Sequence, residues 1–227
     1  MCTSIVVNKG KTIVGWNLDL LDMQYRINPN KNGVYIEIND ATEGWMPLFG
    51  ANSRGEFVGM PTCWPADQRS DPKDDSTNII SLDVDLLLQK KTFEETYNIV
   101  KTKPICSIKG LTFMGSLSDA GGNVLHIVPG QGYNYYERPD YQILTNFSPF
   151  KDNCEVHPWM GRDRYLKAEE LLKQMGNTFD VQDCFKVLKA VAQSVCPTVV
   201  SMVFDVTDRI VYWCEKQNWQ NIQKYQL

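Results

Sequence analysis

The first seven residues of the chain read MCTSIVV (residues 1–7), and the rest of the sequence is interpreted outward from them. Ile5, Val6 and Val7 are apolar and β-branched, which favours a strand close to the N-terminus. Because the side chain of Cys2 is small, we expect the initiator methionine to be removed. Cys2 would then carry both a thiol and a free α-amino group, a nucleophile and a base on one residue. The alternative is that Cys2 is an ordinary small apolar residue that begins a strand.

Length and composition are those of a globular chain with one sizeable core. The chain has 227 residues, of which 43% are hydrophobic and 22% charged, and we expect a single domain over residues 1–227. The formal net charge of −4 and the lack of a large basic cluster argue against nucleic acid as a partner. The sequence shows neither a membrane-length apolar run nor a secretory signal, so we expect a cytoplasmic protein without a membrane partner. Assembly into a homo-oligomer is left open.

Cysteine and histidine are too scattered to suggest a metal site or a disulfide framework. No two of the seven cysteines have C-x-x-C spacing, and His126 and His157 offer no H-x-x-x-H pair. We therefore expect no cofactor, and we interpret most cysteines as small buried hydrophobes. Besides Cys2, they are Cys63, Cys106, Cys154, Cys184, Cys196 and Cys214.

The predicted elements alternate between groups of strands and pairs of helices. Strands are predicted at residues 3–8, 11–16, 33–38, 46–51, 56–60, 111–118, 124–128, 132–137, 142–145, 199–205, 209–215 and 220–225. Helices are predicted at residues 82–89, 92–103, 162–175 and 181–193, with a capping box at Thr92 and Glu95 and with Asp180 as an N-cap. Residues 66–77 are predicted to form an exposed loop. Hairpin-rich sheets interrupted by helical pairs indicate an α+β fold with sheets layered against helices.

Five short segments, in this order, resemble those of the N-terminal-nucleophile cysteine amidases. The resemblance is to the choloylglycine hydrolase and penicillin V acylase family and to the acyl-CoA:6-aminopenicillanate acyltransferase-like proteins, and it runs nearly end to end. It implies a four-layer αββα sandwich of two antiparallel sheets covered by helices. The segments are Cys2, GWNLD (15–19), LTN (144–146), DRY (163–165) and TVVSMVFD (198–205), and SDAGG (118–122) matches a common strand and turn.

The resemblance also implies roles for particular residues. Cys2 would be the nucleophile, and its α-amine, with a reference pKa near ~8, would take the thiol proton. Asp19 would hold the amino terminus, and Arg164 would favour the thiolate by its charge. Asp19 could instead be a turn residue. Arg164 could be a surface residue, and Arg162 is an equally basic neighbour.

Asn146 would donate a side-chain N–H to the oxyanion that forms on the substrate. The second donor would be the backbone N–H of Thr62, because Pro61 has none. Otherwise Asn146 is an ordinary turn residue. The remaining candidates for substrate contact are Trp16, Asn17, Phe57, Trp64 and Phe147, four of them aromatic.

Two positions depart from the family pattern. Relatives commonly have arginine at the position of Trp16, and those of the bile-salt type have asparagine near Thr62. The resemblance therefore implies hydrolysis of a linear N-acyl amide through a thioester on Cys2, with the acyl group left undefined. An acyltransferase that uses the same cysteine, and an inactive ligand-binding homologue, are the alternatives.

Overall fold

A single tight turn determines how the N-terminal hairpin is paired. The computed structural model describes residues 1–150 and 160–227, so Cys154 and His157 lie outside the described residues. β1 (Cys2–Lys9) and β2 (Lys11–Asp19) pair antiparallel around Gly10, which has a φ of 78° that glycine adopts without strain. This register places Cys2 opposite Leu18 and leaves Asp19 at the end of β2 beside the chain start.

The hairpin lies in the centre of a six-stranded antiparallel sheet. The strand order is β14-β1-β2-β15-β16-β17. The four added strands are β14 (Tyr141–Leu144), β15 (Thr198–Asp205), β16 (Ile210–Glu215) and β17 (Gln223–Gln226). Cys2 pairs with Leu18 of β2 on one side, and β14 on the other side of β1 ends opposite Ser4, just before Cys2.

A seven-stranded antiparallel sheet packs against the first. Its order is β13-β12-β11-β6-β5-β4-β3. Its strands are β3 (Tyr25–Asn30), β4 (Gly33–Asp40), β5 (Gly44–Asn52), β6 (Phe57–Gly59), β11 (Gly115–Ser118), β12 (Val124–Val128) and β13 (Gly132–Tyr136). The short pairs are β7 (Thr62–Cys63) with β10 (Thr112–Phe113) and, in parallel, β8 (Thr77–Asn78) with β9 (Ile105–Cys106). A 3-10 helix, η1 (Gln68–Ser70), lies between β7 and β8.

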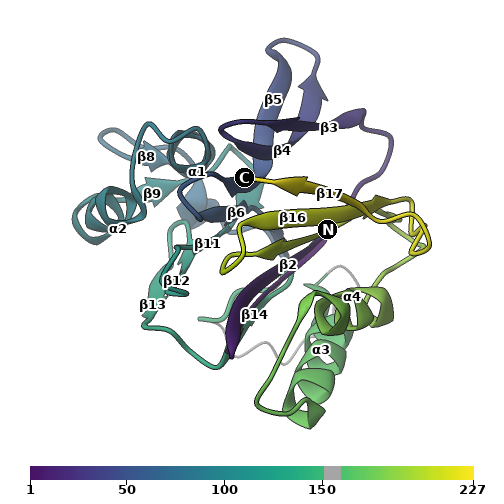
Figure 1. Cartoon of the computed structure of the whole chain (residues 1–227). Helices are drawn as coiled ribbons and strands as arrows, with labels where there is room; N and C mark the ends of the chain where they lie inside the picture. The colour runs from purple at the N-terminus through teal and green to yellow at the C-terminus, as the bar shows by residue number, and fades with distance from the viewer. Residues whose placement is uncertain (151–159) are drawn as a thin grey trace.

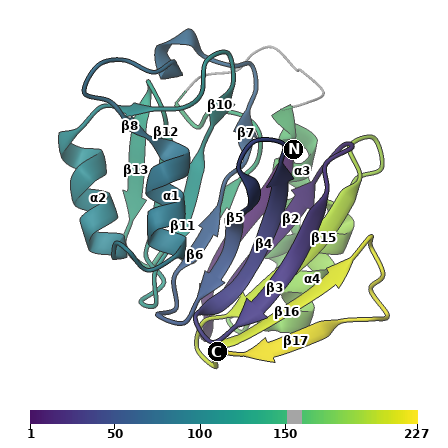
Figure 2. The same cartoon turned by 90° about the horizontal axis from the view of Figure 1, so that it is seen from above.

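Two pairs of helices cover the outer faces of the sheets (Figures 1 and 2). They are α1 (Ile79–Leu87) and α2 (Phe93–Thr102) on the seven-stranded sheet, and α3 (Arg162–Gln174) and α4 (Val181–Ala190) on the six-stranded sheet. Three apolar clusters separate the layers, one between the sheets and one under each helical pair. The expected αββα sandwich of two antiparallel sheets and helices is confirmed.

Most of the predicted elements are present within a few residues of their expected bounds. The capping box of Thr92 with Glu95 and the N-cap at Asp180 are confirmed by their hydrogen bonds. β3 (Tyr25–Asn30) was not predicted, and the strand predicted at residues 33–38 continues to Asp40 as β4. β3 was not predicted because it is polar and contains Pro29, which argues against a strand. The structure accommodates this proline because β3 is an edge strand, where one backbone N–H is not needed for pairing.

Candidate active site

Cys2 lies at the meeting point of three separate parts of the chain. β14 pairs with β1 so that Leu144 is opposite Ser4, and two residues further along Asn146 comes level with Cys2. The backbone N–H of Cys2 donates to Oδ1 of Asn146 at 2.9 Å. Cys2 is 4% exposed and Asn146 is fully buried, so this bond is shielded from water.

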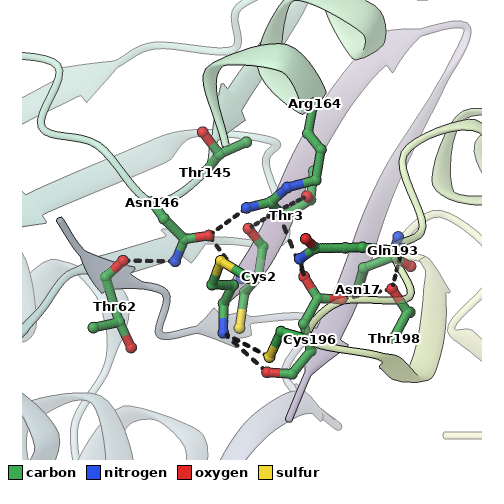
Figure 3. Close-up of polar contacts among 12 residues, drawn as sticks. Cys2, Thr3, Asn17, Thr62, Thr145, Asn146, Arg164, Gln193, Cys196 and Thr198 are labelled. Atoms are coloured by element: carbon green, nitrogen blue, oxygen red, sulfur yellow. Dashed lines mark hydrogen bonds and ion pairs between the residues drawn. The ribbon is translucent and has the colours of Figure 1, made fainter. Parts of the chain in front are cut away.

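Arg164 joins these residues from the first turn of α3. One of its guanidinium nitrogens donates to the backbone oxygen of Cys2 and to Oγ1 of Thr3, both at 2.7 Å, and the other donates to Oδ1 of Asn146 at 2.7 Å. Figure 3 shows the guanidinium pointing from the helix toward these partners. A planar fork of donors is suited to holding several acceptors in a fixed arrangement.

Gly161 makes room for this arginine. It precedes α3 with a φ of 68°, and a Cβ at this position would lie 2.2 Å from a guanidinium nitrogen of Arg164. The buried position of Arg164 on the helix therefore depends on a glycine three residues earlier.

Asp19 is the buried carboxylate of the cluster. Its oxygens accept hydrogen bonds from Oγ1 of Thr198 at 2.6 Å and from the side-chain amide of Gln193, and one lies 3.5 Å from Arg164. Burial raises the pKa of Asp19 to about 6 against the opposing effect of Arg164 and these hydrogen bonds. Gln193 was not among the predicted site residues. It lies between α4 and β15 and belongs to no sequence motif that would indicate a contact with Asp19.

The amino group of Met1 lies at the same end of the hairpin. It donates to the backbone oxygen of Asp19 at 3.0 Å and lies 3.9 Å from the sulfur of Cys196, while Met1 O accepts from the N–H of Asp19 at 2.9 Å. Burial by itself lowers the pKa of this amine, but Cys2, Cys196 and Asp19 outweigh burial and raise it. With Met1 in place, the carboxylate of Asp19 binds Thr198, Gln193 and Arg164, and the amine contacts the backbone of Asp19.

The thiol of Cys2 is neutral in this environment. Burial raises its pKa to about 11, although the positive amino terminus and Arg164 favour the thiolate. Asp19 adds to the increase because a nearby negative charge opposes a second one. A buried thiol of this kind needs a base within reach before it can act as a nucleophile.

The orientation of the Asn146 amide follows from its neighbours. Two donors, Cys2 N and Arg164, point at the same atom, so that atom is the oxygen. The amide nitrogen then donates to the backbone oxygen of Thr62 at 2.6 Å. Because an amide NH₂ carries two hydrogens, one N–H is left for a further acceptor.

The loop of Thr62 and Trp64 supports Asn146 from the other side. The backbone N–H of Trp64 donates to the backbone oxygen of Asn146 at 2.6 Å, and the side chain of Trp64 is half-buried. Phe147 follows Asn146, and its ring lies edge-on to that of Tyr165 with a centroid distance of 5.4 Å. Thr62 and Trp64 thus contact Asn146 directly and Phe147 follows it in the chain, and their contact with a substrate stays a prediction.

The other three candidates are built into the core. Trp16 is fully buried between the sheets and stacks on Phe49, and a Cβ at Gly59 would lie 2.6 Å from its ring. Phe57 is in the same apolar cluster. Asn17 faces α4, where it donates to the backbone oxygen of Leu188 and accepts from Ser201. These side chains have no open surface with which to contact a substrate in this structure.

Comparison with solved structures identifies the fold. A mutant of the conjugated bile acid hydrolase from Clostridium perfringens superposes with a TM-score of 0.70 over 100% of this chain and 92% of its own, at 14% identity. The penicillin V acylase from Agrobacterium tumefaciens gives 0.68 over 100% and 86%, also at 14% identity. The fold is that of the N-terminal-nucleophile hydrolases.

A third neighbour extends this comparison to an animal protein. The Caenorhabditis elegans orthologue of N-acylethanolamine-hydrolyzing acid amidase gives a TM-score of 0.63 over 90% of this chain and 93% of its own, at 19% identity. No family profile and no curated protein sequence matches the chain. The likeness at these identities is one of fold.

Residues 1–150 and 160–227 contain no group of three or more histidine, cysteine or acidic side chains placed to hold a metal ion. In the same residues, no helix is long and apolar enough to cross a membrane.

Proposed function

We propose that the chain is an amidohydrolase that cleaves a linear N-acyl amide with Cys2 as its nucleophile. The observation that carries the proposal is the convergence of Cys2, Asn146 and Arg164 through direct hydrogen bonds, at the start of a central strand of this fold. The three solved neighbours are described as a bile acid hydrolase, a penicillin acylase and an amidase, which supports amide hydrolysis as the class of reaction.

The proposed chemistry begins with removal of Met1. The nitrogen of Cys2 then becomes an amine on the same residue as the thiol, and it takes the thiol proton. The sulfur attacks the acyl carbon, the amine returns the proton to the leaving nitrogen, and a thioester remains on Cys2. Water, activated by the same amine, then attacks the thioester, which releases a carboxylic acid and the thiol.

Each surrounding residue has a part in this proposal. The free N–H of Asn146 and the backbone N–H of Thr62 stabilise the oxyanion. One such donor contributes about 2.7–4 kcal/mol in known cases. Arg164 and Asn146 Oδ1 hold Cys2 in position, and Asp19 balances the buried charge of Arg164. Before Met1 is removed, the nitrogen of Cys2 is a peptide N–H that cannot act as a base, and burial raises the thiol pKa to about 11, so the cysteine is inactive.

The test is intact-mass analysis after incubation with an activated acyl probe that forms a thioester. We expect one adduct, on Cys2, in the processed wild type and none in Cys2→Ser. The cysteines of the described residues are all buried, so none of the other thiols is more accessible to the probe than Cys2 on the basis of burial class. Adducts spread evenly over several cysteines, or an equal yield in Cys2→Ser, would contradict the proposal.

A second arm separates hydrolysis from acyl transfer. A panel of N-acyl amides is incubated with the processed protein, with and without an added primary amine. Free acid in both samples supports the hydrolase, whereas a new amide formed in preference to the acid indicates an acyltransferase.

A further inference from the structure

We propose that a pocket between η1 and β13, outside the candidate active site, binds a small organic anion with an apolar body. The pocket has a volume of about 400 Å³, which is within the range of small-molecule sites. The chain between η1 and β8 forms one wall, and the segment after α2 and the start of β13 form the others. Its lining includes none of the residues assigned to catalysis.

The charged part of the lining favours an anion. Arg69, Lys73 and Lys103 line the pocket and a single acid, Asp71, does so with them. Asp71 is already engaged, because its Oδ1 accepts from the backbone N–H of Gly110 at 3.0 Å. Because Asp67 balances Arg69, the excess positive charge of the lining is that of Lys73 and Lys103 against the single carboxylate of Asp71.

The two lysines differ from Arg69 in their ion pairing. Arg69 forms an ion pair with Asp67 at 2.7 Å, so its charge is balanced within the protein. Within residues 1–150 and 160–227, neither Lys73 nor Lys103 forms an ion pair. Two lysines in the lining of one pocket offer charge-assisted hydrogen-bond donors for a carboxylate or phosphate.

The apolar part of the lining favours a ligand larger than an inorganic ion. Val100, Ile105, Val128 and Tyr133 are among the lining residues. A ligand that fills the volume and meets both kinds of surface has an apolar chain or ring and an anionic end. The chemical class is therefore a carboxylate or phosphate monoester of moderate size.

A hydrogen bond links the pocket wall to the chain segment that follows Asn146. Gln131, on the pocket wall, donates to Oδ2 of Asp67 at 3.0 Å and accepts from Oγ of Ser148 at 2.5 Å. Ser148 is two residues from Asn146. Asp67 therefore contacts both Arg69 and Gln131, and Gln131 contacts Ser148. An anion that competes with Asp67 for Arg69 would change the surroundings of the contact between Asp67 and Gln131.

The test is isothermal titration calorimetry of the full chain with four octyl compounds, each below its critical micelle concentration. We expect octanoate and octyl phosphate to bind at one site, and octylamine and octanol to bind at least about tenfold more weakly. The relative affinity of the two anions distinguishes a carboxylate site from a phosphate site. Raising the salt from low to 0.5 M should weaken anion binding, because charges on the rim are screened.

Charge-reversal variants assign the binding to this pocket. Lys73→Glu and Lys103→Glu should each weaken anion binding about tenfold or more, and Lys31→Glu, an exposed lysine on the β3–β4 turn, should leave it unchanged. Equal binding of all four compounds, equal effects of the three variants, or no binding of either anion would overturn the proposal. None of these ligands is an amide, so the outcome does not depend on the proposed hydrolase activity.

Discussion

The guanidinium of Arg164 and the side-chain oxygen of Asn146 are 2.7 Å apart, and this contact fixes the direction of the Asn146 amide. With its oxygen held by Arg164 and Cys2 N, Asn146 can only turn its NH₂ group toward Thr62 and the space beside it. A residue on α3 thus sets the orientation of the proposed oxyanion donor after β14.

Replacing Arg164 with lysine should lower turnover about 100-fold. A lysine keeps the charge but has one nitrogen in place of a fork, so it cannot hold Asn146, Cys2 and Thr3 together, and small misplacements have costs of this size. The measurement is kcat/KM on whichever N-acyl amide the panel identifies.

The matched control for this variant is Arg162→Lys, two residues earlier and exposed. It should retain near-normal kcat/KM. If both variants lost activity equally, the assignment of Arg164 rather than Arg162 to the site would be wrong.

Gly161→Ala should reduce both stability and activity. The new Cβ would be in a left-handed conformation and would lie 2.2 Å from the guanidinium of Arg164. A strained backbone of this kind costs about 1–3 kcal/mol, and the arginine must also move. Urea unfolding and kcat/KM give the two readouts.

Gly176→Ala is the comparison for Gly161→Ala, because a Cβ there has no heavy atom within 4 Å and the backbone is not left-handed. It should leave activity unchanged and stability unchanged or slightly higher. Equal unfolding free energies and equal activities for the two alanine variants would show that Gly161 has no special role.

Trp16→Ala should act on stability rather than on substrate choice. The ring is fully buried between the sheets against Phe49, and removal of such a side chain costs about 3–5 kcal/mol. The unfolding midpoint in urea should fall sharply, and the remaining folded protein should rank N-acyl amides in the same order as the wild type. If the variant had normal stability but hydrolysed the N-acyl amides in a different order of preference, Trp16 would have to contact the substrate.

Most strands and helices, and the α+β class, could be predicted from the sequence because their signals are local, whereas the four-layer sandwich followed from the family resemblance. The Lys9-Gly10-Lys11 turn, the capping box at Thr92 and the alternating strands each depend on a few neighbouring residues. Cys2, Asp19, Asn146 and Arg164 are brought together as the resemblance implied, although their catalytic roles stay predictions.

The parts that could not be read from the sequence depend on packing between distant segments. Trp16, Asn17 and Phe57 looked like pocket residues because position along the chain does not reveal which face of a strand is covered. Gln193 binds Asp19 across 174 residues, and no local pattern could connect them. The role of Gly161 was not predicted, because it consists only in leaving space for the guanidinium of Arg164.

Asp83 should make the protein less stable as the pH rises. This carboxyl on α1 is fully buried, and neither oxygen has a hydrogen-bond partner within the described residues. Burial therefore raises its pKa well above the ordinary value of 3.8. Below pH 3.8 the group is protonated in both the folded and unfolded states, so its contribution to stability does not change with pH. Above that pH the unfolded chain releases the proton first, and each further unit costs the folded state up to about 1.4 kcal/mol until the raised pKa is reached.

The measurement for Asp83 is urea unfolding of wild type and Asp83→Leu from pH 4 to pH 8. The stability of the variant relative to wild type should increase as the pH rises from 4 to 8, in addition to any constant difference present at pH 4. Asp85→Leu is the control, since Asp85 lies on the same helix, is partly exposed and pairs with Lys90 and Lys91. It should show no such gain. If the Asp83→Leu curve ran parallel to wild type at every pH, the carboxyl would have to be ionised and compensated in the folded protein.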